Sequence, residues 1–269
     1  MKLIVCMLSA LVLLCGCASG PAANPRDPLE PFNRGVFRFN DAVDKAVLKP
    51  VATAYHDVLP TPVRRGVANF FGNLEDAWSF VNNTLQLKGE AAADSLARFG
   101  VNTLFGLGGV LDVASEMRIE KHTKDFGHTL GYWGVAPGPY LVLPLLGPSS
   151  LRETAALPVD MQGDIVGNLG HVPTRNTLIV LRAIDTRSEL LKATAMLEQA
   201  ALDRYTFTRD AYLQRRLSTV YDGNPPAEKT GEIWPAQQDG AEPQAETATE
   251  PGPETLIKTG LPGDGKEKP

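Results

Sequence analysis

Cysteine is nearly absent from the 269-residue chain, and its three cysteines lie within the first 17 positions. The body that follows them therefore has no thiol, no disulfide and no cysteine-ligated metal site. The four histidines, His56, His122, His128 and His171, show no HExxH or comparable metal spacing. From these absences we expect neither a metal ion nor a bound cofactor.

Catalytic motifs are missing as well. There is no GxSxG nucleophile elbow, and Ser149 and Ser150 are better explained as residues that start a helix. A triad of one serine with His171 and either Asp112 or Asp160 is an alternative, but nothing in the sequence brings these residues together. We therefore predict that the protein is not an enzyme and has no catalytic residues.

An excess of positive charge is also lacking. The chain carries 26 Lys and Arg against 31 Asp and Glu, and the net −5 equals that of positions 223–269, with nine acidic and four basic residues. A body of balanced charge lacks the basic surface that nucleic-acid binding requires. The segment 223–269 is rich in Pro, Gly, Glu, Thr and Gln, which predicts a disordered acidic tail.

The N-terminus has the features of a bacterial lipoprotein signal peptide. A basic residue comes second, positions 3–14 are apolar but too short to span a bilayer, and the sequence LCGC ends at Cys17. This ending resembles the lipobox, in which the last cysteine becomes the acylated first residue of the mature protein. We therefore predict a signal peptide at 1–16, a lipid anchor at Cys17 and a linker at 17–26. No Asp follows the cysteine, which favours the outer membrane.

Helical spacing dominates the body between these ends. Phe32, Val36, Phe39, Val43 and Val47 recur at intervals of three and four and form one stripe of an amphipathic helix. Strand-like alternation is scarce, so we predict an all-α body with one helical domain. We place that domain at 27–222. Further helices are predicted at 51–58, 63–85 and 96–104, from residue 151 onward, at 174–202 with a bend near 185–188, and at 208–221.

A long uncharged stretch interrupts the helices. Positions 126–151 contain no Asp, Glu, Lys or Arg, but four prolines prevent a continuous helix. A capping box formed by Ser150 and Glu153 predicts that a helix starts directly afterwards. The stretch is then an irregular, apolar, Gly/Pro-rich hairpin that is either buried in a core or in contact with lipid.

One helical segment favours lipid over water. Within 63–85 the aromatic residues Phe70, Phe71, Trp78 and Phe80 lie round more than one face, and a helix that is apolar all round is buried in a large core or in lipid. No segment after the signal offers an apolar helix of spanning length. Our hypothesis is that short amphipathic helices lie in the membrane plane, and an ordinary compact bundle is the alternative.

Several motifs occur together in an order typical of one family. They are DPLEPFNR at 27–34, Phe39 with Asn40, KPV at 49–51, the turn at 106–112 and, most specifically, DFGHTLGYWGVAPGPYLVLPLLGPSSLRE at 125–153. Over about 27–221 the chain resembles the MlaA (VacJ) family of outer-membrane lipoproteins. Glu153 stands where the family pattern has Asp, and the acidic tail lies outside that pattern.

The resemblance implies a ring of helices around an amphipathic pore in the inner leaflet of the outer membrane. It implies association with trimeric porins, a periplasmic lipid carrier of the Mla type as partner, and passive removal of mislocalised phospholipids from the outer leaflet. The hairpin would gate the pore, and the helix that carries Phe39 and Asn40 would support it. The gate candidates are Gly138, Pro139, Leu141, Leu143, Pro144, Leu145, Leu146 and Gly147.

Two other functions stay open at this point. The first is a structural envelope lipoprotein that binds porins without transporting lipid, and the second is an enzyme of lipid turnover. The sequence also leaves open the preferred lipid headgroup and acyl chain, the porin, the role of the tail and the direction of net lipid flow.

Overall fold

The computed structural model describes residues 24 and 26–226. The chain divides into two compact units, Met1–Ile233 and Trp234–Pro269, and all described residues belong to the first. The predicted signal peptide, the predicted lipid anchor Cys17 and nearly all of the predicted tail lie outside the described residues.

Helices make up most of the described residues, which confirms the predicted all-α fold, and a two-stranded sheet is the other regular element there. The elements are α2 (Glu30–Val43), the π-helical turn η1 (Asp44–Leu48), α3 (Lys49–Val58), α4 (Thr61–Leu85), α5 (Gly89–Leu104), α6 (Val113–Glu116), α7 (Phe126–Tyr132), β1 (Tyr140–Leu143), β2 (Gly147–Ser150), α8 (Leu151–Gly163), α9 (Val172–Glu189), α10 (Leu191–Ala200) and α11 (Arg204–Val220).

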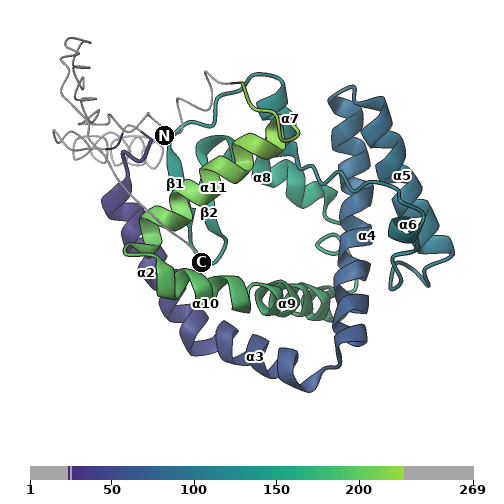
Figure 1. Cartoon of the computed structure of the whole chain (residues 1–269), viewed down its shortest axis with the longest axis horizontal. Coiled ribbons are helices and arrows are strands. Elements are labelled where there is room, and N and C mark those ends of the chain that lie inside the picture. The colour runs from purple at the N-terminus through teal and green to yellow at the C-terminus, as the bar shows by residue number, and fades with distance from the viewer. Residues whose placement is uncertain (1–23, 25, 227–269) are drawn as a thin grey trace, which may run out of the picture. The chain divides into compact units, whose positions relative to one another are not determined.

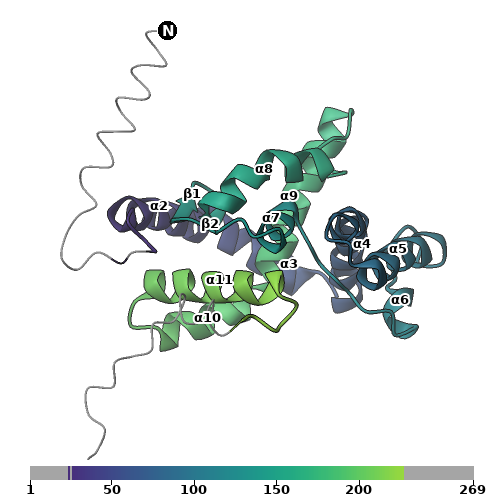
Figure 2. The same cartoon turned by 90° about the horizontal axis from the view of Figure 1, so that it is seen from above.

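The elements of the first unit follow one another round a ring (Figure 1). The helix α3 packs against α9, and α9 packs against α4. From α4 the contacts lead through α7 and α8 to the β-hairpin, and β1 contacts α2, which closes the ring. The helices α10 and α11 lie together on one side of α2, the hairpin and α8 (Figure 2).

A continuous helical path runs from Glu30 to Val58 although Pro50 lies within it. A proline has no N–H to donate, and its ring clashes with the carbonyl of the preceding turn. That turn, Asp44–Leu48, is wound as a π-helix, a wider turn that leaves room for the proline ring. Pro50 then lies in the first turn of α3, where proline is tolerated.

Polar and apolar side chains are inverted relative to a protein that folds in water. Among the described residues, 21 polar or charged residues are buried against 11 hydrophobic ones, and four of those 11 are alanines. Large hydrophobic side chains are exposed instead. Phe32, Phe39 and Val47 of the predicted apolar stripe are 56%, 52% and 59% exposed. Contact of such surface with water costs about 25 cal/mol per Å², so these outward faces fit an apolar environment.

The helix α4 shows how the interior is built. The buried positions in its second half are Asn73, Asp76, Ser79, Asn82 and Asn83, and Gln86 directly after the helix is buried too, whereas Val81 and Leu85 point outward. Asn83 Nδ2 donates to Ser95 Oγ of α5 at 3.1 Å. The amide nitrogens of Asn73 and Gln86 donate to Thr103 and Thr129, whereas the amide oxygens of Asn73, Asn83 and Gln86 have no partner among the described residues. These donor contacts join the neighbouring helices on the inner side.

A buried ion-pair network joins α4, α5 and α6. The guanidinium of Arg98, whose side chain is 3% exposed, lies 3.3 Å from Asp76 and 2.9 Å from Asp112. It also donates to the carbonyl of Ile119 at 2.7 Å. A buried charge is strongly unfavourable unless it is paired and hydrogen-bonded. Arg98 therefore fixes the relative positions of these three elements.

Two predicted helix ends agree with the structure. The helix α5 ends at Leu104, before a turn in which Gly108 and Gly109 have φ of +72° and +96°, values that favour glycine. The long C-terminal segment breaks at Leu190 into α9 and α10, two residues after the predicted bend at 185–188.

Other local predictions need correction. The hairpin expected to be irregular is a regular two-stranded β-ladder. The helix α8 starts at Leu151 as predicted, but the capping box is wrong, because the hydroxyl of Ser150 donates to the carboxylate of Glu153 and caps no backbone N–H. The short helix α7 was not predicted. Its signal is a capping box in which Asp125 accepts from His128 N at 2.8 Å and His128 Nδ1 accepts from Asp125 N at 3.1 Å.

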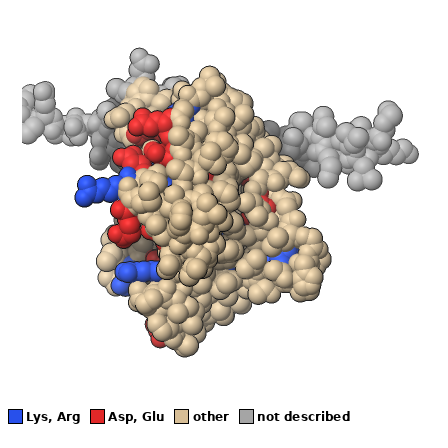
Figure 3. All heavy atoms as spheres, turned by 90° about the vertical axis from the view of Figure 1, so that its right-hand side faces the viewer, with Lys and Arg blue, Asp and Glu red and all other residues tan. Residues whose placement is uncertain are grey.

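In the part of the chain that the structure describes, every helix is too short or too polar to cross a membrane. Figure 3 views the side of the first unit that carries α4 to α6, where charged side chains gather along one edge and most of the remaining surface is uncharged. A charged edge beside an uncharged face is the pattern expected of helices that lie in a membrane interface.

We predict that Asp76→Ala lowers the free energy of unfolding by about 3 kcal/mol or more, because it leaves Arg98 buried with one carboxylate fewer. The matched control is Asp57→Ala, at a side chain that is 68% exposed, which should change stability by less than about 0.5 kcal/mol. Chemical unfolding of both purified variants in one detergent checks this. Equal stabilities would contradict the structural role of the Arg98 network.

Candidate functional site

The predicted gate residues lie in and beside the β-hairpin. The strands β1 and β2 pair in antiparallel register and are joined by a turn at 144–146. In this turn Leu145 and Leu146 are 69% and 67% exposed. Leu145 has a φ of +63°, which is strained for a residue other than glycine and persists only where neighbours hold it. The hairpin therefore presents an apolar tip whose backbone conformation is imposed by its contacts.

Asn33 of α2 fixes the base of the hairpin. Its side chain is fully buried, donates to the carbonyl of Tyr140 at 2.9 Å and accepts from the N–H of Val142 at 2.9 Å. The same amide nitrogen also donates to the carboxylate of Asp27 at 2.8 Å. Both amide hydrogens and the amide oxygen are thus used, and the side chain pairs with the outer edge of β1 as another strand would.

Asn40 repeats this arrangement at the turn. It comes seven residues after Asn33, about two helical turns, and so lies on the same face of α2. Its amide donates to the carbonyl of Leu143 at 2.9 Å and accepts from the N–H of Leu145 at 2.8 Å. These two bonds hold the strained turn against the helix, while the preceding Phe39 is exposed.

Asp27 connects the start of α2 to the last helix. Its carboxylate, 1% exposed, accepts from the hydroxyl of Tyr205 and from Arg209 Nη1 at 3.3 Å, in addition to Asn33. Burial and the bond to this carboxylate raise the pKa of Tyr205 well above its usual range. The hydroxyl therefore remains a donor at neutral pH, and the base of the hairpin is fixed from α11 as well.

Two arginines meet where the chain leaves the hairpin. Arg152 donates from Nε and Nη2 to Glu153 at 3.0 and 2.7 Å, and from Nη1 to the carbonyl of Val135 at 3.0 Å. Arg216 of α11 donates to the two carboxylate oxygens of Asp125 at 2.6 and 3.1 Å, and to Glu153 at 3.1 Å. This arginine cluster, made of Arg152, Glu153, Arg216 and Asp125, joins α7, α8 and α11.

The helix α7 has glycines where the arginines approach it. A Cβ atom on Gly127 would lie 2.8 Å from Arg216 Nη2, and one on Gly131 would lie 2.6 Å from Arg152 Nη1. The two glycines are one turn apart and share a face. Any larger residue would push the guanidinium groups away, which gives a physical reason for both glycines in the sequence DFGHTLG.

The buried setting of the cluster shifts the pKa of its acids and of His128. Burial raises the pKa of Asp125, but hydrogen bonds from His128 and Arg216 outweigh it and hold the pKa well below its usual range. The pKa of Glu153 is lowered too, because Arg216, Ser150 and Arg152 together outweigh burial. Burial lowers the pKa of His128, so its ring is neutral at pH 7.

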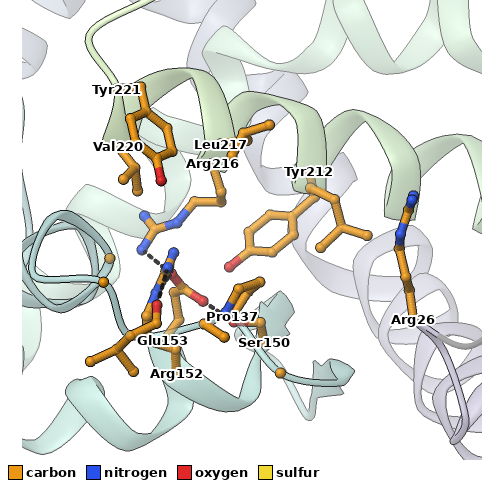
Figure 4. A pocket seen from close by; sticks show the side chains of 16 residues that line it. Arg26, Pro137, Ser150, Arg152, Glu153, Tyr212, Arg216, Leu217, Val220 and Tyr221 are labelled. Carbon is orange, nitrogen blue, oxygen red and sulfur yellow. Dashed lines mark hydrogen bonds and ion pairs between the residues drawn. The ribbon is translucent and has the colours of Figure 1, made fainter. Parts of the chain in front are cut away.

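A cavity of about 490 Å³ lies between α11, the start of α8 and the loop after α7 (Figure 4). Arg152, Glu153 and Arg216 of the arginine cluster form part of one wall, and Tyr212 points into the space from α11. The lining residues are Arg26, Gly131, Gly134, Val135, Ala136, Pro137, Gly138, Ser150, Arg152, Glu153, Tyr212, Leu213, Arg216, Leu217, Val220 and Tyr221.

The triad weighed from the sequence is not assembled. Asp160 accepts from Trp78 Nε1 and from the N–H of Phe126, both at 2.8 Å, whereas His171 bonds to Thr174 beside it. Asp112 forms an ion pair with Arg98.

The sequence analysis missed Asn33, Arg152 and Arg216 as site residues, although Asn33 and Arg152 lie within motifs that carry the family resemblance. The seven-residue spacing of Asn33 and Asn40 was the available signal for a shared helix face. No pattern in the sequence relates Arg216 to the arginine cluster, since its partners lie 63 and 91 residues away.

The model of the MlaA lipoprotein family matches residues 25–219. The chain belongs to the MlaA lipoprotein family. This confirms the family resemblance that the sequence motifs indicate. The match covers nearly all of the described residues.

Named relatives agree with the family assignment. The intermembrane phospholipid transport system lipoprotein MlaA of Shigella flexneri is 40% identical over 220 residues, 77% of this chain and 86% of that protein. The protein of the same name from Escherichia coli (strain K12) is 39% identical over 228 residues, with the same coverage. A solved MlaA-like structure, described as the structural basis for maintenance of bacterial outer membrane lipid asymmetry, matches with a TM-score of 0.64 and 36% identity, and covers 74% of this chain and 99% of its own.

We predict that Asn40→Ala releases the hairpin turn without unfolding the ring. The N–H of Leu145 loses its acceptor, so its hydrogen exchange should become about tenfold faster or more. In the matched variant Asn33→Ala, the faster exchange should appear at Val142 instead. Unchanged exchange at Leu145 in Asn40→Ala would contradict the proposed contact.

We predict that the stability contributed by His128, Asp125 and Glu153 is lost in two steps as the pH is lowered. His128 has a lowered pKa in the folded state, so the unfolded chain binds its proton first and stability decreases below about pH 6.5. Asp125 and Glu153 also have lowered pKa values, so the stability that they contribute above about pH 4 is lost as the pH falls further. In His128→Asn the denaturant midpoint should change less between pH 7 and pH 5 than it does in the wild type. An unchanged slope would contradict the assignment to His128.

Proposed function

We propose that the protein is a lipoprotein of a Gram-negative outer membrane and acts as a passive conduit for phospholipids. It removes mislocalised phospholipids from the outer leaflet and passes them to a periplasmic carrier of the Mla type, which maintains lipid asymmetry. Family membership supports this proposal, because relatives over most of the chain bear the name intermembrane phospholipid transport system lipoprotein.

The observation that carries the proposal is the inverted placement of side chains. The outward faces of the ring are apolar, and the buried contacts between its helices are polar. Helices without the length or apolarity to span a bilayer can bury such outward faces by lying within one leaflet. The ring would then exclude the surrounding lipids of the inner leaflet and leave a polar route for a headgroup through its middle.

The hairpin is the gate in this proposal. Its apolar tip, Leu145 and Leu146, and the strand residues Leu141 and Leu143 would contact the lipid acyl chains. Gly138, Pro139, Pro144 and Gly147 would let the segment bend, and Gly138 and Gly147 have positive φ. Non-helical backbone is tolerated at membrane depth where it is packed in protein or lines a water-filled cavity. Asn40 would act as a positioning residue that holds the gate.

The remaining parts of the proposal concern anchoring and partners. Cys17, outside the described residues, would carry the acyl chains, and two or more chains make a stable anchor. A trimeric porin would hold the ring in the outer membrane. Because no energy-coupling motif is present in the sequence, flow would follow the downhill movement of misplaced lipid or depend on the partners.

We predict that Leu143→Asp impairs lipid removal, because a charge in the gate repels acyl chains. Phospholipid exposed on the cell surface should rise to about the level of the deletion strain while the protein level stays normal. The conservative variant Leu143→Met should behave like the wild type. A surface-restricted probe of phospholipid measures this, with Cys17→Ala as the anchor control. No rise on deletion of the gene would favour the scaffold function, and normal removal by Leu143→Asp would refute the gate.

A further inference from the structure

The cavity beneath α11 is chemically different from the hairpin gate. Most of its wall is apolar, with Val135 and Pro137 from the loop and Leu213, Leu217 and Val220 from α11. Apolar walls with a few convergent polar groups are the usual composition of a ligand site, and about 490 Å³ falls within the usual range of pocket volumes. This space can take one acyl chain, whereas a whole diacyl phospholipid is larger.

The polar wall of the cavity is built from buried charges. The side chains of Arg152 and Glu153 are 6% and 9% exposed, and that of Arg216 is 17% exposed. A buried charged cluster is a costly way to join three helices, since apolar residues of similar volume often serve as well. Its presence at the wall of an apolar cavity therefore points to a role besides packing.

The arginines retain donors for a ligand. Each guanidinium carries five N–H groups, and the described residues accept three hydrogen bonds from Arg152 and three from Arg216. The carboxylates of Asp125 and Glu153 are already engaged by these donors. Arg216 Nε is buried and has no hydrogen-bond partner among the described residues, so it can donate to an anion that enters the cavity.

We propose that this cavity binds a single-chain anionic lipid. The acyl chain lies along the wall of Leu217, Val220 and Pro137, and the anionic head lies at Arg152 and Arg216. The shared chemistry is one acyl chain with an anionic head, which a lysophospholipid supplies as phosphate and a fatty acid as carboxylate. The site goes beyond the proposed conduit, because it selects lipids that have lost a chain and holds them beside the hairpin.

The test is lipid binding by the purified full chain in a neutral detergent, counted by native mass spectrometry. Palmitoyl-lysophosphatidylglycerol should bind at one per chain. Palmitoyl-lysophosphatidylcholine, whose head is zwitterionic, should bind at least about tenfold more weakly, equivalent to about 1.4 kcal/mol. Glycerol phosphate, which has no chain, should not bind. Palmitate, which has a carboxylate head, distinguishes the two sources. If palmitate binds, the site accepts any anionic head; if it does not bind, the site requires a phosphate.

Variants locate the binding within the cavity. Leu217→Trp fills the space and should weaken binding of palmitoyl-lysophosphatidylglycerol by about tenfold or more, whereas Val180→Trp, at an exposed position of α9, should leave it unchanged. Arg216→Gln should abolish the preference for the anionic head, and Leu217→Trp keeps the test decisive if Arg216→Gln does not fold.

Two results would overturn the inference: equal binding of the anionic and zwitterionic lipids, or full binding by Leu217→Trp. The measurement uses purified protein, so such a result leaves the conduit proposal intact. Conversely, no rise in surface phospholipid on deletion of the gene would refute the conduit and leave the cavity proposal standing.

Discussion

The described part of this protein depends on one constraint: its helices pack through polar and charged side chains and leave many large apolar side chains outside. Arg98 between Asp76 and Asp112, and the amides of α4 against α5, are the contacts that make this possible. Because these groups are buried, removal of one partner leaves an unpaired charge or amide in the interior, which costs more free energy than the pair itself contributes.

The hairpin is also held in place by a few buried polar side chains. A two-stranded hairpin alone is only marginally stable, and this one gains its position from side chains of α2. Asn33 shares its amide with Asp27, and Asp27 is engaged by Tyr205 and Arg209, so the base of the hairpin is fixed by several bonds. Asn40 contributes two bonds and no more at the tip. A firmly held base and a lightly held tip are the mechanical conditions for a segment that bends at its end.

The sequence predicted the class of fold well and the site less well. Apolar residues at helical spacing predicted the helices, since this signal depends only on neighbours along the chain. The same stripes did not reveal which face is buried, because a helix with an inverted environment has the same periodicity. The hairpin was recognised from its glycines and prolines, but its β-ladder depends on Asn33 and Asn40, more than 100 residues away. The predicted capping box at Ser150 failed for a related reason, because Glu153 is drawn to Arg216 of a distant helix.

The bonds of Asp27 also have a consequence for how the chain folds. Its partners Tyr205 and Arg209 lie 178 and 182 residues further along the chain, and Tyr140 of β1 lies 107 residues after Asn33. Contacts of such high sequence separation form late and make folding slow, because loop closure must precede them. Until α2 covers it, the edge of β1 offers unpaired backbone groups to any other strand. The helix α2, the first in the described part of the chain, therefore completes its contacts late, and β1 is most prone to aggregate before α2 and α11 are in place.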